Sequence, residues 1–172
     1  MRTWWRALSP RNRKAAPASR RTLRSKFYRY IDFERLEDRT LPSTFQWIGG
    51  GADNNWSTGA NWSLVSGSGS FPNAPGDVAR FNGSYSGAQS VVVNQAITVG
   101  EIDFGTTQNV TIGASGGNVL TLDDTGTGAN AVLDVGLTFS NSGVDLISAP
   151  VAVAAGTPLA AQITGGTLQL TN

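Results

Sequence analysis

The sequence contains neither cysteine nor histidine. Without cysteine there is no disulfide framework and no thiolate chemistry. Without histidine the chain lacks the usual proton shuttle near neutral pH and the commonest transition-metal ligand. No apolar run approaches the ~20 residues of a membrane-spanning helix, so we expect no transmembrane span. These absences make an enzyme the least favoured class, and we expect no cofactor and no metal.

Positive charge is almost absent beyond residue 40, where Arg80 is the only Lys or Arg. Residues 1–40 hold twelve basic and four acidic side chains, whereas residues 41–172 hold one basic and eight acidic. The first region therefore has a net charge of +8 and the second of −7. We interpret residues 1–43 as a basic, mostly disordered leader that engages the export machinery. A twin-arginine signal at Arg20-Arg21 is disfavoured because no hydrophobic segment follows it. Nucleic-acid binding is the alternative role of such a tail, but it has no reading motif, so we expect none.

Residues 33–43 read FERLEDRTLPS and directly follow the arginine-rich segment. This stretch resembles the LEPR-XLL-type motif near the N-terminus of large bacterial surface and secreted proteins. Asp38 stands where the motif has proline, and Pro42 stands where it has a second leucine. The resemblance implies sorting to the cell envelope, the outer surface or the medium. The residues that carry it are Glu34, Arg35, Leu36, Glu37, Arg39 and Leu41.

Three of the five tryptophans lie in one block, Phe45–Ser63, which reads FQWIGGGADNNWSTGANWS. We expect folded structure to begin here, with a first strand around Phe45 and Trp47. Two interpretations of Trp56 and Trp62 are open: buried packing, or a platform on which saccharide rings stack. The first makes residues 44–89 a Trp/Gly-rich N-terminal capping region. The second makes the chain a carbohydrate-binding β-sandwich module.

The segment from Trp47 to Phe81 resembles the opening of bacterial autotransporter-associated β-strand repeat proteins. The order of its Trp, Gly-Gly, Asn-Trp and Pro-Gly-Asp elements carries this resemblance, and Gly165–Leu170 resembles the repeat unit of the same family. The resemblance implies a surface or secreted repeat protein. The matching positions are Trp47, Gly49, Gly50, Asn55, Trp56, Asn61, Trp62, Pro75, Gly76, Asp77 and Phe81.

Residues 90–172 contain many short apolar runs separated by glycine-rich turns. Alternation such as Leu120-Thr121-Leu122 and Leu168-Gln169-Leu170 places one apolar row inside. We predict an all-β fold: a right-handed parallel β-helix (solenoid) with a Trp-rich cap and coils of about 20–25 residues. A β-sandwich is the alternative. Strands are predicted at 91–93, 97–99, 101–104, 110–112, 119–122, 131–135, 137–140, 144–147, 151–153, 162–164 and 167–170.

No motif links the carboxylates of the second region into an acid pair or a calcium loop. We interpret them as solvated turn residues: Asp103, Asp123, Asp124, Asp134 and Asp145. The predicted function is therefore a non-enzymatic structural or adhesion-type protein of a bacterial surface. Its expected partners are envelope components or extracellular glycans. Because residues 167–170 read as a strand, we expect a short member of this class or the opening of a longer architecture.

Overall fold

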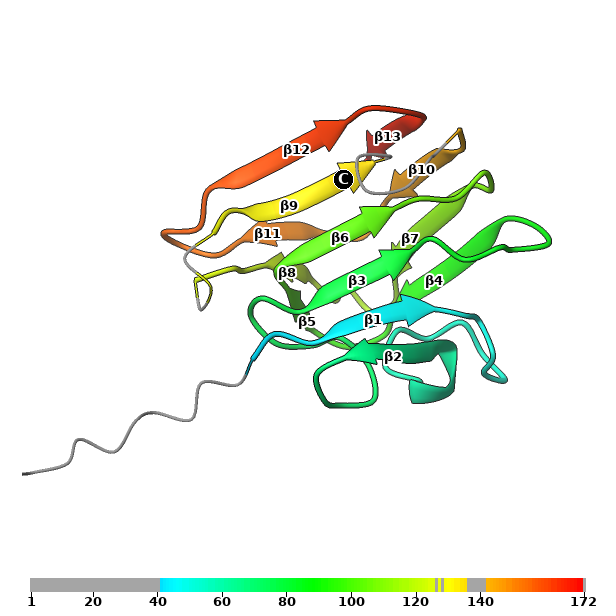
Figure 1. Ribbon diagram of the computed structural model, residues 1–172, viewed down its shortest axis with the longest axis horizontal. Coiled ribbons are helices and arrows are strands. Elements are labelled where there is room, and N and C mark those ends of the chain that lie inside the picture. The colour runs from blue at the N-terminus through cyan, green and yellow to red at the C-terminus, as the bar shows by residue number, and fades with distance from the viewer. Residues whose placement is uncertain (1–40, 126, 128, 136–141, 172) are drawn as a thin grey trace, which may run out of the picture. The chain divides into compact units, whose positions relative to one another are not determined.

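The computed structural model describes residues 41–125, 127, 129–135 and 142–171, all within the unit Asp38–Asn172. Its regular structure is almost entirely strand, and no α-helix occurs in these ranges (Figure 1). Sheet A has the order β12-β9-β6-β3-β1-β2, sheet B the order β13-β10-β7-β4, and sheet C the order β11-β8-β5. The all-β class predicted from the sequence is confirmed.

The strands are short and fall into the three sheets as follows. Sheet A contains β1 (Thr44–Trp47), β2 (Trp62–Ser66), β3 (Val78–Phe81), β6 (Glu101–Phe104), β9 (Ala131–Val135) and β12 (Leu159–Ile163). Sheet B contains β4 (Gln89–Val93), β7 (Val110–Ala114), β10 (Val144–Ile147) and β13 (Thr167–Leu170). Sheet C contains β5 (Ile97–Val99), β8 (Leu120–Leu122) and β11 (Val151–Val153), and a 3-10 turn, η1 (Gly59–Asn61), precedes β2.

From β3 onward the chain visits sheets A, B and C in strict rotation. We call one passage through the three sheets a circuit. Corresponding strands of successive circuits pair in parallel, as β3 does with β6 and β6 with β9. The circuits differ in length, since Val78 pairs with Glu101 but Glu101 pairs with Val132. Among the described strands, the antiparallel pairing that dominates β-sandwiches occurs only between β1 and β2.

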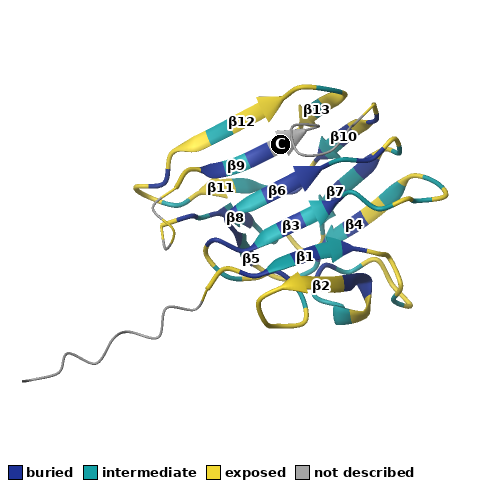
Figure 2. Ribbon diagram, in the orientation of Figure 1, coloured by how far each residue is buried: buried dark blue, intermediate teal, exposed yellow. Residues whose placement is uncertain are grey.

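The core is a stack of inward-facing apolar side chains, one row per strand. Along each strand successive side chains point to opposite faces, so alternate residues enter the core. Ile97 and Val99 of β5 are buried, and so are their register partners Leu120 and Leu122 of β8. Figure 2 shows the buried residues concentrated in the middle circuits. The prediction of an inward apolar row is thus confirmed for Leu120 and Leu122.

The last circuit departs from that prediction. Leu168 is only half-buried and Leu170 is 55% exposed, although Leu170 is in register with the buried Ile147 of β10. The reason is position: β13 is the outermost strand of sheet B, so no further row covers its side chains. The apolar row exists, but at this end it is open to solvent.

Most predicted strands are confirmed, one is displaced, one lies outside the described residues, and one observed strand was not predicted. β2 was not predicted, because Trp62–Ser66 has no clear alternation and exists through its pairing with β1. β12 begins at Leu159 and not at Gln162, so the prediction was displaced. The predicted strand 137–140 lies outside the described residues. The leader, residues 1–40, also lies outside them, and the domain limits 1–43, 44–89 and 90–172 stay predictions. Sheet A joins the second and third of these regions through β3 and β6.

Candidate functional site

The tryptophan block folds into an aromatic cluster in the core. The rings of Trp47 and Trp62 meet edge to face with centroids 5.1 Å apart, and those of Trp56 and Trp62 lie 5.0 Å apart. Phe81 of β3 contacts this group, with 5.6 Å between its centroid and that of Trp62. Phe104 of β6 stacks on Phe81 at 5.5 Å. Each such contact adds about 0.5–1.5 kcal/mol to the stability that burial provides.

The two tryptophans considered for glycan stacking are both inside. Trp56 is 0% exposed and Trp62 is 5% exposed. The Trp56 indole N–H donates to the carbonyl of Pro72 at 2.8 Å, and the Trp62 indole N–H donates to the carbonyl of Trp56 at 2.7 Å. In this arrangement neither ring presents a face to a saccharide. Packing is the role that the geometry supports.

The tryptophan block contacts the first edge of sheet B, and Asn73, which follows the block in the chain, contacts the first edge of sheet C. The Trp56 N–H donates to the Val92 carbonyl of β4 at 2.8 Å, and the Val92 N–H donates to the Asn54 carbonyl at 2.9 Å. The Thr98 N–H of β5 donates to the side-chain oxygen of Asn73 at 2.9 Å. Strand edges that lack a partner strand are therefore bonded to loop groups here. A sheet edge covered in this way does not recruit another strand.

Asn61 holds the loop that makes these contacts. Its amide is fully buried, and its oxygen accepts from the Gly51 N–H at 2.8 Å. Its nitrogen donates to the carbonyls of Asp53 at 2.9 Å and of Asn55 at 3.0 Å. Three backbone groups that would otherwise be unsatisfied are thus bonded to one side chain. The sequence marked Asn61 only as part of an Asn-Trp repeat.

The glycines and Pro-Gly-Asp of the predicted capping motif shape the neighbouring corners. Gly49 has a φ of +58° and Gly76 a φ of +81°, a region that L side chains rarely adopt. Pro75 is exposed and precedes Gly76. A Cβ on Gly100 would lie 2.6 Å from the Cα of Gly76, so these two corners stack in direct backbone contact. These glycines of the motif therefore allow the tight turns and the close backbone packing at the corners.

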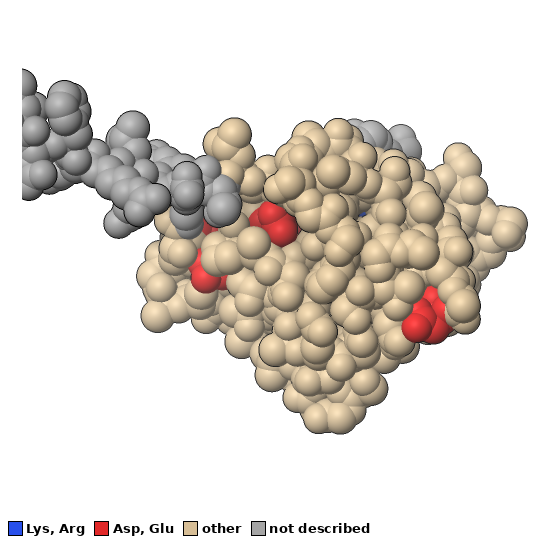
Figure 3. All heavy atoms as spheres, turned by 90° about the horizontal axis from the view of Figure 1, so that it is seen from below, with Lys and Arg blue, Asp and Glu red and all other residues tan. Residues whose placement is uncertain are grey.

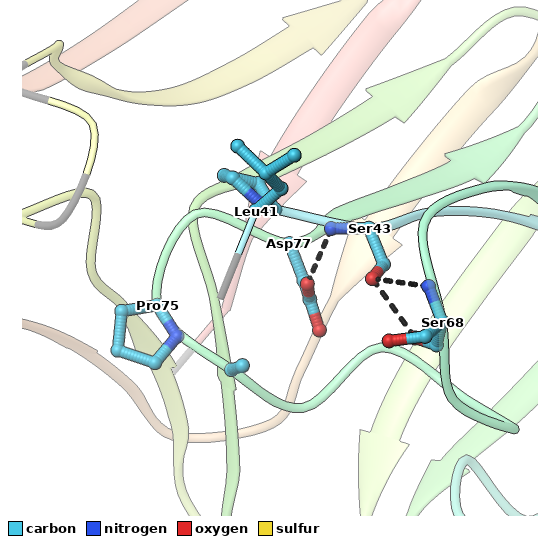
Figure 4. A pocket seen from close by; sticks show the side chains of 7 residues that line it. Leu41, Ser43, Ser68, Pro75 and Asp77 are labelled. Carbon is cyan, nitrogen blue, oxygen red and sulfur yellow. Dashed lines mark hydrogen bonds between the residues drawn. The ribbon is translucent and has the colours of Figure 1, made fainter. Parts of the chain in front are cut away.

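A small hollow lies beside this corner and is lined by Leu41, Pro42, Ser43, Ser68, Ala74, Pro75 and Asp77 (Figure 4). The buried Asp77 carboxylate accepts from the Ser43 N–H at 2.8 Å and from the Asn73 N–H at 3.0 Å. The Ser43 hydroxyl donates to the Ser68 carbonyl at 2.8 Å. These polar groups bond to one another, which ties the entry of β1 to the next circuit.

The carboxylates interpreted as solvated turn residues are mostly not solvated. Asp103 and Asp145 are 0% exposed and lie on strands β6 and β10, so that interpretation was wrong for them. Asp103 lies 3.4 Å from the guanidinium Nε of Arg80, its register partner in β3. Asp145 accepts from the Val110 N–H at 3.0 Å. Burial of a carboxylate requires such compensation.

Asp124 is also buried, Asp123 is half-buried, and the side chain of Asp134 lies outside the described residues. Figure 3 shows acidic side chains in a few separate patches on a largely uncharged face. Within the described ranges no group of three or more His, Cys, Asp or Glu side chains gathers as metal ligands would. Among the described side chains, Asp77 and Asp145 accept hydrogen bonds from backbone N–H groups, and Asp103 forms an ion pair with Arg80.

Two ionisable groups near the block have shifted pKa values. The Thr58 side chain and then the Asn55 N–H donate to Asp53 and lower its pKa below the ordinary 3.8. Burial raises the pKa of Tyr85 to about 12. The Tyr85 hydroxyl donates to the Trp47 carbonyl at 2.9 Å. The protonated phenol is therefore needed for the hydrogen bond that joins Tyr85 to β1.

Of the sorting-type motif, Glu34, Arg35, Leu36, Glu37 and Arg39 lie outside the described residues. Leu41 is described and is 80% exposed. Comparison with protein-family models, curated proteins and solved structures found no match. No helix in the described part of the chain has the length and apolar character needed to cross a membrane.

Proposed function

We propose that the chain is a right-handed parallel β-solenoid that serves a structural or adhesion-type role at a bacterial surface. The observation that carries this proposal is the strict rotation of the chain through three sheets with parallel pairing between circuits. Parallel crossover connections within one sheet are right-handed in nearly all proteins. Stacked circuits build a rigid body in which each unit contacts only its neighbours. Such a body displays its outer faces to partners.

The tryptophan block acts in this proposal as the cap of the first circuit. Its bonds to Val92, together with the bond from Asn73 to Thr98, are what a cap needs, because solenoids require protected terminal edges. The resemblances to the autotransporter-associated repeats and to the LEPR-XLL-type motif support location at the envelope or outside the cell. The leader then serves export. Envelope components or extracellular glycans are the proposed partners, and catalysis is not part of the proposal.

A double-cysteine experiment tests the solenoid. Thr98 and Thr121 are register partners on neighbouring circuits of sheet C. Parallel neighbours lie ~4.8 Å apart, within the Cα separation that a disulfide spans. We expect Thr98→Cys/Thr121→Cys to form an intrachain disulfide on mild oxidation, whereas Thr98→Cys/Thr111→Cys, which places the thiols on different sheets, does not. An equal yield in both variants would contradict the stacking.

The location is tested in the bacterium that makes the protein. We expect the chain in the envelope or medium fraction, and mass spectrometry of the mature form to show that residues 1–40 are missing. Recovery of the intact chain from the cytoplasm alone would contradict export.

Glycan stacking by the tryptophans is tested separately. Because Trp56 and Trp62 are buried, we expect no shift in tryptophan fluorescence when polysaccharides are added. A saturable shift that Trp62→Phe abolishes, in a variant that remains folded, would return the platform to consideration.

A further inference from the structure

Asn82 and Gly83 form the only Asn-Gly pair in the sequence. They lie directly after β3, outside the ladder that pairs Val78–Phe81 with β6. In such a pair the backbone nitrogen of the glycine can attack the side-chain carbonyl carbon of the asparagine, because glycine has no Cβ that hinders the approach. The ring that forms is the first step of asparagine deamidation. This pair therefore has the residue types for a reaction that the chain carries out on itself.

Neither reacting group of this pair is held by a hydrogen bond. The side-chain oxygen of Asn82 is buried and has no hydrogen-bond partner among the described residues. In the same part of the chain the Gly83 N–H donates to no other group. A buried acceptor without a donor is unfavourable by about 1–3 kcal/mol. The reaction therefore breaks no hydrogen bond of this amide.

Other asparagines near the tryptophan block are held in place. The Asn94 side-chain oxygen accepts from the Ser57 N–H at 3.2 Å, and its nitrogen donates to the Ser57 hydroxyl at 2.8 Å. Asn73 bonds to the Thr98 N–H, and Asn61 bonds to backbone groups through both its oxygen and its nitrogen. Each of these asparagines is followed by a residue that has a Cβ. The sequence and the hydrogen bonding thus single out the same asparagine.

We propose that Asn82 is a site of spontaneous deamidation in the folded chain. The Gly83 nitrogen gives up its proton and bonds to the Cγ of Asn82, and the bond from Cγ to the side-chain nitrogen breaks, so that ammonia leaves with the proton. Water then opens the succinimide ring. Attack of water at Cγ gives aspartate, whereas attack at the main-chain carbonyl carbon gives isoaspartate, in which the main chain runs through Cβ and Cγ.

The products disturb the contact between this turn and β1. The Tyr85 N–H donates to the Gly83 carbonyl at 3.0 Å, and the Tyr85 hydroxyl donates to the Trp47 carbonyl at 2.9 Å. A Cβ on Gly83 would lie 2.6 Å from the Tyr85 ring, so the turn has no spare room. Isoaspartate inserts an additional main-chain carbon just before this turn. Both products also place a carboxylate where a neutral oxygen is buried, which is unfavourable.

Incubation of the purified full chain in mildly alkaline buffer tests the reaction. Deamidation adds one negative charge to a chain with a formal net charge of +1, so ion exchange separates the product, and peptide mapping by mass spectrometry locates it. We expect Asn82 to react several-fold faster than Asn54 and Asn130, which are exposed but are not followed by glycine. Equal rates at the three positions would overturn the proposal.

The same incubation in urea gives the rate for the unfolded chain. We expect Asn82 to react in the folded chain as well, because its amide and the Gly83 N–H are not held by other groups. An Asn82 that reacts in urea and stays intact in the folded chain would overturn the proposal, since the fold would then protect the pair.

Two glutamine variants assign the site. Asn82→Gln should abolish the acidic product, because the longer side chain closes a larger ring far more slowly. Asn54→Gln is the matched control at an exposed position, and we expect it to form the acidic product at the unchanged rate. An acidic product that forms equally fast in Asn82→Gln would come from another residue and would overturn the assignment.

Urea unfolding of the separated forms tests the consequence for the fold. We expect the isoaspartate form to unfold at a lower urea concentration than the fresh chain. Asn82→Asp, which carries the charge on an ordinary main chain, should lie between the two. An isoaspartate form as stable as the fresh chain would overturn the proposed effect on the turn.

Discussion

At the scale of single residues, polar side chains bonded to distant backbone groups determine the path of the loops. Asn61, Asp77 and Asn73 each bond to backbone N–H or C=O groups elsewhere in the fold. Glycine acts at the corners in the opposite way, because Gly100 leaves room for the backbone of Gly76. The stability of the described body therefore depends partly on a few polar side chains that satisfy backbone groups in the loops.

Replacing Asn61 should be costly. Asn61→Ala leaves the Gly51 N–H and the carbonyls of Asp53 and Asn55 without their partner in a buried place. We expect the free energy of unfolding to fall by about 2–4 kcal/mol. The exposed Asn54→Ala serves as the control and should change it by less than ~0.5 kcal/mol. Urea unfolding followed by tryptophan fluorescence measures both, and similar values for the two would contradict the role given to Asn61.

Tyr85 should make the protein sensitive to high pH. Its pKa is raised to about 12 in the folded chain, above the ordinary 10.0, so folding favours the neutral phenol. The stabilisation is fully present below pH 10 and is lost as the pH rises from 10 towards 12. Tyr85→Phe should flatten this part of the stability profile measured by urea unfolding. An unchanged profile in Tyr85→Phe would assign the loss to other groups.

At the scale of elements, the strands are determined by local apolar alternation, whereas the corners are determined by contact between successive circuits. Apolar alternation and glycine-rich turns predicted nearly every strand from β4 to β13, because the alternation is local to each strand, and β4, β5, β7 and β8 bury alternate residues. β2 was missed since its strand character comes from pairing with β1, which sequence alternation does not record. The burial of Asp103 was missed for a similar reason: its neighbours in sheet A come from other circuits.

The stacking of corners leads to a glycine prediction. Gly100→Ala would place a Cβ 2.6 Å from the Cα of Gly76, so the corner must move, at a cost of about 1–3 kcal/mol. A Cβ on Gly87 would meet no atom within 4 Å, and the φ of Gly87 is not positive, so Gly87→Ala should be neutral or slightly stabilising. Thermal unfolding of the two variants compares them. Equal melting temperatures would show that the corners are not in tight contact.

At the scale of the whole described body, the tryptophan block and the strands β11, β12 and β13 lie at opposite ends of one continuous core. The sequence predicted the capping region through its tryptophans, but it did not settle whether Trp56 and Trp62 face inward. Indole rings suit both a core and a glycan surface, and only their neighbours in space decide. The exposure of β11, β12 and β13 was likewise visible only once the sheet order showed them to be the outermost described strands.

This difference in burial between the middle and the last strands predicts a gradient of local stability along the stack. Amides of β11, β12 and β13 should exchange with solvent faster than those of the middle strands β5 and β6, by orders of magnitude. The reason is that the last strands are exposed, whereas Ile97 and Ile102 are fully buried. Hydrogen exchange read by mass spectrometry measures this, and uniform protection along the stack would contradict it.

The unequal circuits have a consequence for how such a protein changes over time. β5 and β6 are separated by Gly100 alone, whereas the equivalent strands β8 and β9 are separated by residues 123–130. The added residues leave the pairing of β6 with β9 in parallel register. The number of residues in the connection between sheets C and A can therefore vary without breaking the strand pairing. We expect insertions and deletions at this corner to change the outer surface and to leave the buried rows intact.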